Sequence, residues 1–342
     1  MTVLHLLGTA GEGGAETYFL DLVTSLARSG QSQAAAIRSN AHREKSLTAA
    51  GVPVGLYRFG GPADVLTRFQ VAGFARRQET KLALAWMNRA ARHTPKGPWA
   101  RIGRLGGYYN LKYYRGFDEL VANTEDIADW IVGQGWPAGK VRYIPNFAAA
   151  PPDVAPVDRA SLQTPPDAPL LLSMGRLHEV KAQDVAISAL RDLPEAWLWI
   201  AGVGPQEGRL KALAEALGVS HRVRFLGWRN DPSALYRTAD ICVFPSRYEP
   251  LGNVVIQAWA HGLPVVAAAS QGPSALIRSG EDGILTAIDD VAAFAAGVRQ
   301  LLDDPMLRIR LVQNGAERVE GEFSETAVQA RWQTLFADYG AA

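Results

Sequence analysis

The chain has 342 residues, a formal net charge of +1 and 48% hydrophobic residues. This composition favours a globular protein, and the length favours two domains instead of a single domain with one core. Its one cysteine excludes an internal disulfide, and no apolar run approaches the roughly 18 residues that cross a membrane. The start MTVLHLLGTAGEGGAE lacks the basic residues of a secretion signal, so we expect a cytoplasmic protein.

The first half of the chain predicts alternating strands and helices. The apolar run TVLHLLG predicts a buried strand, which a glycine-rich loop follows. A helix is expected from about Ala15, because apolar residues recur there at helical spacing until Gly30 ends it. Short strands are expected at 33–37 and 53–57. ELVANTEDIADWIV predicts a strand, a turn and a helix, and VRYIPNF predicts a further strand.

Charge is distributed unevenly. Residues 1–150 contain 18 Lys and Arg against 11 Asp and Glu, whereas residues 151–342 contain 17 against 23. Within the first half, residues 68–115 hold 11 basic residues and one acidic residue, with aromatic residues between them. This stretch is either a solvated face or a surface for anionic lipid head groups or a phosphorylated acceptor. Nucleic acid is disfavoured, because the other half is acidic and carries no nucleic-acid-binding motif.

A proline-rich stretch divides the chain. Residues 148–169 hold six prolines and no apolar periodicity, which is typical of a linker. After it, strands alternate with helices, which predicts a mostly parallel sheet covered on both faces. The expected strands lie near 170–174, 197–201, 223–226, 241–244, 264–267 and 283–286. The expected helices lie near 181–191, 206–217, 232–238, 253–262, 274–279, 290–303, 306–319 and 324–338.

Polar residues at the strand ends of the second half are candidates for a site, because ligands of open α/β sheets bind beyond the carboxyl ends of strands. Arg176 and Lys181 follow one strand, where two cations suit a diphosphate, although such a pair is more often simply solvated. Gly252, Asn253 and Val254 begin a helix at another strand end, where backbone N–H groups favour an anion.

The glycine-rich loop GTAGEGGAET offers a second approach to an anion. Gly13 and Gly14 precede a helix and allow backbone to come close to a ligand, with a purely structural turn as the alternative. The spacing is not that of the dinucleotide fingerprint, and no acidic residue ends the second strand. A nicotinamide dehydrogenase is therefore disfavoured.

Several segments together resemble the retaining glycosyltransferases of sequence family 4. GRLHEVKAQDVAISAL is similar to the family's G-R-L…K-G-x-D segment, and AGVGPQEGRLKALAEALGVSHRVRFLG to its A-G-x-G-P…V-x-F-L-G run. EPLGNVVIQAWAHGLPVVA resembles the signature of two glutamates eight positions apart followed by A-x-x-x-G-x-P-V-V-A. GEGGAETYFLDLVTSLARSG and VRYIPNF resemble the family's N-terminal G-G-A-E and V-x-x-I-P-N segments.

The resemblance implies the GT-B fold, an α/β architecture of two facing Rossmann-like domains with a cleft between them. The implied parts are an acceptor-side domain over 1–150, a linker over 151–168, a nucleotide-sugar domain over 169–322 and a last helix over 323–342 that returns to the first domain.

It also implies roles for single residues. The catalytic residues would be Glu249 on the transferred sugar, and Arg176 and Lys181 on the donor diphosphate. The remaining donor contacts would come from Gly13, Gly14, Gly227, Trp228, Leu251, Gly252, Asn253, Val254 and Gln257. The family needs no metal and no other cofactor, and the six dispersed histidines offer no ligand cluster.

Two departures from the family pattern stand out. Gln257 occupies the place of the second glutamate, so a neutral amide would meet the ribose. The histidine of the family's first domain has no counterpart in WARIGRLGGYYNLKYY, and His93 is a weak substitute. The candidates for acceptor contact are Asn88, Arg89, Arg104 and Tyr108.

We therefore predict a hexosyltransferase that uses a nucleoside diphosphate sugar, with UDP as the expected nucleotide. The basic first half resembles members that glycosylate lipid anchors, such as lipopolysaccharide core enzymes. A glycolipid acceptor, a peripheral position on the cytoplasmic face of the inner membrane and no nucleic-acid partner are expected. The alternatives are a nucleotide-sugar epimerase on the same fold and a non-catalytic protein that binds anionic lipid.

Overall fold

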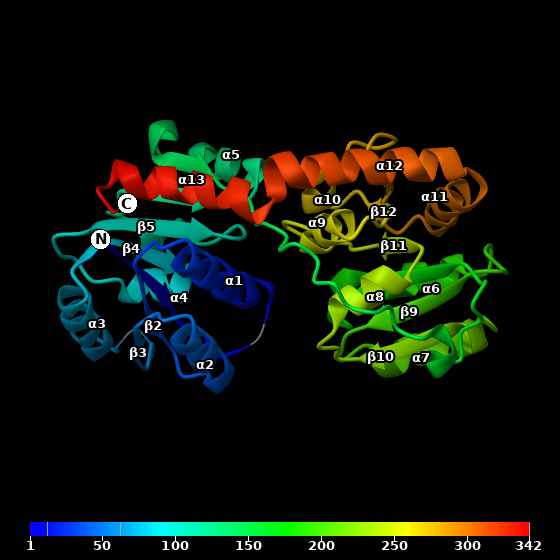
Figure 1. Cartoon of the computed structure of the whole chain (residues 1–342), viewed down its shortest axis with the longest axis horizontal. Helices are drawn as coiled ribbons and strands as arrows, with labels where there is room; N and C mark the ends of the chain where they lie inside the picture. The colour runs from blue at the N-terminus through cyan, green and yellow to red at the C-terminus, as the bar shows by residue number, and fades with distance from the viewer. Residues whose placement is uncertain (12, 62, 342) are drawn as a thin grey trace. The chain divides into compact units, whose positions relative to one another are not determined.

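The computed structural model describes residues 1–11, 13–61 and 63–341 and forms two compact units. Unit 1 comprises Met1–Asn146 and Glu325–Ala342, and unit 2 comprises Phe147–Ser324. Each unit has its own parallel sheet and its own apolar core (Figure 1). The predicted α/β fold class with two doubly wound sheets is confirmed.

Unit 1 is built on a seven-stranded sheet in the order β3-β2-β1-β4-β5-β6-β7, with every pair parallel. The strands are β1 (Thr2–Leu7), β2 (Gln33–Ile37), β3 (Val54–Leu56), β4 (Thr80–Trp86), β5 (Ala100–Leu105), β6 (Glu119–Ala122) and β7 (Val141–Tyr143). The helices are α1 (Gly14–Arg28), α2 (Ala41–Ala49), α3 (Leu66–Arg77), α4 (Met87–His93), α5 (Glu125–Gly133) and α13 (Glu325–Asp338).

The last helix, α13, belongs to unit 1. Arg28 of α1 pairs with Glu325 at 2.8 Å, and Arg142 of β7 pairs with Asp338 at 2.9 Å. Trp332 is fully buried on the side of α13 that faces the unit. The expectation that the C-terminal helix packs on the N-terminal domain is thus met (Figure 1).

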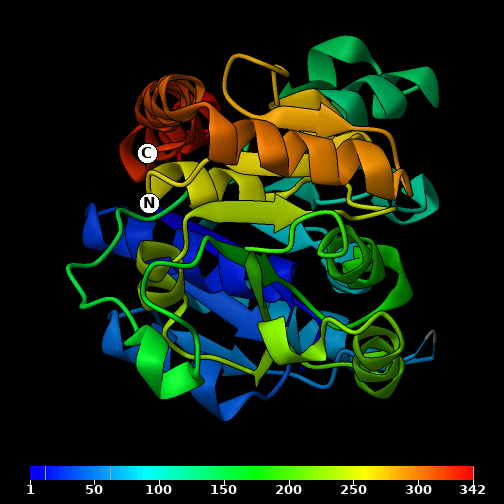
Figure 2. The same ribbon diagram turned by 90° about the vertical axis from the view of Figure 1, so that its right-hand side faces the viewer.

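Unit 2 is built on a six-stranded sheet in the order β10-β9-β8-β11-β12-β13, again with parallel pairs. Helices cover both of its faces (Figure 2). The strands are β8 (Leu170–Met174), β9 (Trp197–Ala201), β10 (Val223–Gly227), β11 (Ile241–Phe244), β12 (Val265–Ala268) and β13 (Ile284–Thr286). The helices are α6 (Gln183–Ala189), α7 (Glu207–Ala216), α8 (Pro232–Thr238), α9 (Asn253–Ala260), α10 (Gln271–Leu276), α11 (Val291–Asp303) and α12 (Pro305–Arg318).

The proline-rich stretch is held on unit 2. Arg159, in a single 3-10 turn (Arg159–Leu162), donates to Asp240 at 3.0 Å and to the Ala168 carbonyl at 2.9 Å. Val157 N donates to Thr238 Oγ1 at 2.7 Å. These bonds hold the middle of the proline-rich stretch against residues 238–240, which precede β11.

The strand order places a switch point in each sheet. In unit 2 the order reverses between β8 and β11, and in unit 1 between β1 and β4. Ligands of doubly wound sheets bind at the carboxyl ends of the strands beside such a point. The loops after β8 and β11 contain residues 175–182 and 245–252, which include Arg176, Lys181 and Glu249.

Three helices of unit 1, α2, α3 and α4, were not predicted from the sequence. Helix α2 is short and polar, with few buried residues, so its apolar periodicity is weak. Helix α3 exposes Leu66 and Phe69, which breaks the apolar stripe expected of a half-buried helix. Tertiary packing of Val71 and Phe74 decides its orientation instead.

A buried histidine in β1 predicts that the stability of unit 1 depends on pH. His5 is fully buried, donates to Gln33 Oε1 at 2.5 Å and accepts from Trp86 Nε1 at 3.3 Å. Burial lowers the pKa of His5 to about 4. The unfolded chain binds this proton near pH 6.5 and the folded chain does not, so stability falls as pH drops from about 6.5 to about 4, by roughly 3 kcal/mol in all.

Urea unfolding of the wild type and of His5→Phe between pH of about 7 and about 4.5 measures this effect. The pH-dependent loss should be smaller in His5→Phe, which has no imidazole to protonate. His42→Gln replaces an exposed histidine and serves as the control, which should lose as much stability with falling pH as the wild type. An equal change of the unfolding free energy with pH in all three proteins would contradict the prediction.

Candidate active site

The loop after β8 is fixed by close backbone packing. Gly175 N donates to the Ala201 carbonyl at 3.0 Å. Gly202 has a φ of +148°, and a Cβ on it would lie 1.9 Å from the Gly175 carbonyl oxygen. Glycine alone allows this approach, so backbone packing sets the position of the loop that carries Arg176.

Arg176 presents a free cation at the carboxyl end of β8. Its side chain is exposed, and no described residue accepts a hydrogen bond from its guanidinium. Its carbonyl accepts from the buried Gln183 side chain at 3.3 Å, which holds the backbone in place. A guanidinium of this kind is available for a phosphate.

Lys181 pairs with Glu249. Lys181 ends a 3-10 turn (Glu179–Lys181), and its Nζ forms an ion pair with Glu249 Oε2 and lies 5.5 Å from the centroid of the Phe244 ring. The two side chains are only 23% and 15% exposed. The structure thus brings together two residues predicted from separate motifs, across the switch point between β8 and β11.

The loop after β11 ends at the start of α9. Glu249 Oε1 accepts from Gly252 N at 3.3 Å, and Gly252 adopts a left-handed φ of +86° as the N-cap of the helix. Leu251 packs on Gly272, where a Cβ would lie 2.4 Å from the Leu251 carbonyl carbon. The Glu249 carboxylate and the first N–H groups of α9 therefore lie together at the start of this helix.

Helix α9 carries two predicted donor residues on one face. Asn253 and Gln257 are four residues apart and therefore neighbours on the helix surface. The Gln257 side chain is half-buried and makes no hydrogen bond to a described residue. Val254 packs at the edge of the apolar core, and its backbone N–H lies in the first turn of α9, where the helix supplies no acceptor for it.

Arg247 is a residue that the sequence analysis did not single out. Its Nη2 donates to Asp184 Oδ2 at 2.8 Å, its Nε to Asp289 at 2.6 Å and its Nη1 to the Glu179 carbonyl at 2.9 Å. The hydrogen bonds to Asp184 raise the pKa of Arg247 above its ordinary value. Arg247 therefore ties the loop of Glu249 to the segment that contains Lys181. No sequence signal separates it from a solvated loop cation.

Gly227 and Trp228, the predicted base contacts, lie at the end of β10. Gly227 has a φ of +63°, and its carbonyl accepts from Gly202 N at 2.8 Å. Trp228 is 69% exposed and Val203, after the neighbouring β9, is 46% exposed. An exposed indole is a suitable surface for a nucleotide base.

In unit 1, Gly13 and Gly14 lie at the start of α1 as predicted. Gly13 is the N-cap, in extended conformation and without a side-chain cap, and α1 begins at Gly14. Arg43 donates to the carbonyls of Thr9 and Gly11 at 3.0 and 2.9 Å, which holds these two residues after β1.

The predicted acceptor residues lie after β4 and around the end of β5. Asn88 and Arg89 are in the first turn of α4, where Arg89 is exposed and the Asn88 Oδ1 is buried without a described partner. Arg104 is a buried residue of β5. The hydroxyl of Tyr108 donates to Asp126. Their role in acceptor binding stays a prediction.

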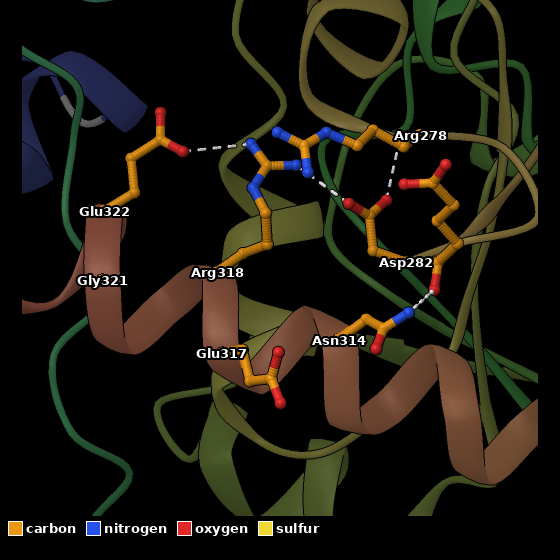
Figure 3. Close-up of a pocket in the computed structure, with 8 residues that line it drawn as sticks. Arg278, Asp282, Asn314, Glu317, Arg318, Gly321 and Glu322 are labelled. Atoms are coloured by element: carbon orange, nitrogen blue, oxygen red, sulfur yellow. Dashed lines mark hydrogen bonds and ion pairs between the residues drawn. The ribbon is translucent and has the colours of Figure 1, made fainter.

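A separate pocket of about 340 Å³ lies between α12 and the turn before β13 (Figure 3). Arg318 donates to Asp282 at 2.9 Å and to Glu322 at 3.2 Å, and Asn314 donates to the Glu281 carbonyl at 2.7 Å. These groups pair with one another, and no predicted donor residue lines the pocket. The cluster is therefore assigned to the packing of α12.

Within the described ranges, no group of three or more His, Cys, Asp or Glu side chains is arranged to hold a metal ion. In the same ranges, no helix combines the length and the apolar character needed to cross a bilayer.

Comparisons with known proteins identify the family of the chain. The family model of the glycosyl transferases group 1 matches residues 154–318, which contain the loops after β8 and β11. Two relatives from Rhizobium meliloti (strain 1021) match nearly the whole chain. They are the lipopolysaccharide core biosynthesis glycosyltransferases LpsE, 39% identical over 95% of this chain and 96% of its own, and LpsD, 36% identical over 98% of each.

A solved structure shows the same fold at low sequence identity. The Anabaena protein HepE, crystallised with UDP, superposes with a TM-score of 0.86 over 99% of this chain and 100% of its own, at 19% identity. The two relatives are more than 30% identical over nearly the whole chain, and the chain belongs to the group 1 family of glycosyltransferases.

Proposed function

We propose that the protein transfers a hexose from a UDP-sugar to a glycolipid or polysaccharide acceptor of lipopolysaccharide or cell-envelope synthesis, with retention of configuration and without a metal. The observation that carries the proposal is the convergence of Lys181, Glu249 and the amino end of α9 at the switch point of unit 2. The two relatives named for lipopolysaccharide core synthesis and the structural neighbour crystallised with UDP support it.

The proposed chemistry separates charge. The bond between the anomeric carbon and the phosphate oxygen breaks, an acceptor hydroxyl adds to that carbon, and the products are a glycoside, UDP and a proton. Arg176 and Lys181 stabilise the negative charge that develops on the leaving diphosphate. The N–H groups of α9 bind the phosphate and sugar oxygens, and Glu249 accepts hydrogen bonds from the sugar hydroxyls.

A screen of nucleotide sugars for release of free nucleotide, with total membrane lipid as acceptor, tests the function. We expect a UDP-sugar to be consumed only when acceptor is present, at a rate that excess chelator does not change. The anomeric configuration of the product, determined by NMR, should be that of the donor. Loss of activity in chelator with recovery on adding manganese would contradict the metal-free proposal.

Gln257 provides a test of ribose recognition. Its side chain lies away from the bond that breaks, so it should contribute equally to ground state and transition state and affect donor KM more than kcat. Gln257→Glu introduces a charged acceptor and should tighten UDP binding several-fold, by about 1 kcal/mol, while Gln257→Ala weakens it similarly. Calorimetry with UDP measures both. Wild-type affinity in both variants would exclude a ribose contact.

We also propose that unit 1 binds anionic membrane lipid on the cytoplasmic face of the inner membrane. Val65, Leu66 and Phe69, at and before the start of α3, are 61%, 63% and 74% exposed. Arg68 and Arg76 lie exposed on the same helix. Apolar side chains beside cations suit a membrane surface, where each cation contributes about 1 kcal/mol and salt screens the attraction.

Sedimentation with liposomes tests this proposal. The protein should bind anionic vesicles, bind zwitterionic ones much less, and release as salt increases. The double variant L66S/F69S should lose binding. The matched control, M306S/I309S, changes two exposed apolar residues of α12 that are 71% and 49% exposed, and should keep it. Loss of binding in the control alone would place the membrane surface on unit 2 and overturn the proposal.

A further inference from the structure

The end of β5 buries a guanidinium that has no counter-charge. Arg104 is 2% exposed, and its Nη2 donates to Asn146 Oδ1. Its guanidinium carbon lies 4.8 Å from the centroid of the Trp86 ring and 5.1 Å from that of Tyr18. Among the described residues, no carboxylate pairs with it. Burying a charge in this way is costly unless something else compensates it.

Two donor groups of Arg104 remain unused. Its Nε is buried without a hydrogen-bond partner, and no described residue accepts from its Nη1. Burial lowers the pKa of Arg104, as expected for a cation without a nearby anion. Asn123, which follows the neighbouring strand β6, has its Oδ1 buried without a partner, and its Nδ2 is the group of this side chain that can donate to an anion.

Gly106 lets its backbone lie close to these donors. The point where a Cβ of residue 106 would lie is 2.6 Å from Arg104 Nη1 and 3.6 Å from Asn123 Nδ2. A Cβ there would crowd Nη1, so the glycine is what allows the guanidinium and the Asn123 amide to lie together beside residue 106.

A second buried arginine shows how the fold satisfies such a group when no ligand is needed. Arg222 in unit 2 donates to the carbonyls of Leu190, Leu193 and Ala196 at 2.7 to 2.9 Å. Arg222 is therefore a structural residue with its donors satisfied by backbone, and Arg104 is not.

We propose that Arg104, Gly106 and Asn123 form an oxyanion site in unit 1 that binds a carboxylate or phosphate group of the acceptor. The site lies at the carboxyl ends of β5 and β6, where doubly wound sheets bind ligands. A guanidinium fork matches either anion, and the surrounding rings exclude water from the contact. The assignment of the ligand as the acceptor rests on the proposed function.

Thermal unfolding with simple anions tests the site. Inorganic phosphate and glucuronate are compared with chloride at equal ionic strength, and glucose controls for the sugar ring. All samples contain saturating UDP, so that phosphate does not report on the donor site. A probe at ten times its Kd should raise the Tm of the wild type by roughly 3 °C. An effect of phosphate alone identifies a phosphorylated acceptor, and an effect of glucuronate alone identifies an acidic sugar.

Two variants remove the site in different ways. Arg104→Met deletes the cation, and Gly106→Ala keeps it but places a methyl group between the donors, at a residue whose backbone is not left-handed. Both should lose the anion-dependent rise in Tm, and their kcat/KM for an acidic acceptor should fall roughly 10- to 100-fold. Arg222→Met and Gly107→Ala are the matched controls and should keep the rise.

The controls also separate this inference from the proposed function. A rise in Tm with anions that persists in both Arg104→Met and Gly106→Ala would overturn the site, and so would no rise in the wild type. UDP titration of each variant runs alongside. A chain that binds UDP but shows no Arg104-dependent anion effect contradicts this inference alone, whereas failure of the wild type to bind UDP contradicts the proposed function.

Discussion

Replacement of Lys181 by alanine should reduce turnover by roughly 100-fold or more at saturating donor. The Nζ of Lys181 is partly buried beside Glu249 and Phe244, where a cation acts on a developing charge more strongly than it would in water. Arg176→Ala should have an effect of the same order, because it removes the other cation of the strand end. Steady-state kinetics with the UDP-sugar identified by the screen measure both.

Lys211 offers a close control for Lys181. It lies in the same unit, pairs with Glu207 at 2.7 Å and has its Nζ 5.5 Å from the centroid of the Phe225 ring. Lys211→Ala therefore removes a similar ion pair and ring contact outside the proposed site, and turnover should stay at the wild-type level. Wild-type turnover in Lys181→Ala or Arg176→Ala would remove that residue from the catalytic machinery.

Glu249→Gln should separate transfer from nucleotide binding. The carboxylate is proposed to accept hydrogen bonds from the sugar hydroxyls, and a glutamine loses the charge of that contact, so transfer should fall by roughly 100-fold. A diphosphate at Lys181 competes with Glu249 for the same ammonium group. Removing the negative charge should leave UDP affinity unchanged or improve it several-fold, by about 1 kcal/mol.

Kinetics and UDP calorimetry on one preparation measure the two effects together. Glu207→Gln, the partner change in the Lys211 pair, controls for loss of a surface carboxylate. A glutamine at 249 retains an oxygen for the Gly252 N–H, so the loop should keep its conformation. If Glu249→Gln transfers at the wild-type rate, the carboxylate does not act on the sugar.

Much of the fold follows from the sequence because its strands are short, buried and continuous in apolar residues. Strands β8 to β13 and the helices between them lie within a few residues of their expected positions. Helices α2, α3 and α4 were missed, because α2 is polar, α3 exposes Phe69 and α4 has only seven residues. A regular spacing of apolar residues reflects a buried helix face, and none of the three helices has a regular buried face long enough to show it.

The site was predictable where a motif marked it and not where geometry alone defines it. Lys181 and Glu249 belong to separate motifs, and their pairing follows from the position of β8 and β11 as neighbouring parallel strands. Arg247 lies two residues before Glu249, yet its partners Asp184 and Asp289 are far away in sequence. The sequence likewise does not show that donors of Arg104 lack partners, because this depends on the residues, such as Asn123 after β6, that the fold places beside them.

Calorimetric titration of the wild type and of Lys181→Ala with UDP tests the central claim most directly, because it measures binding at the loops after β8 and β11 without knowledge of sugar or acceptor. The account predicts one UDP per wild-type chain and affinity at least tenfold weaker in Lys181→Ala, a difference of about 1.4 kcal/mol. No binding of UDP to the wild type, or equal affinity in the two proteins, would contradict it.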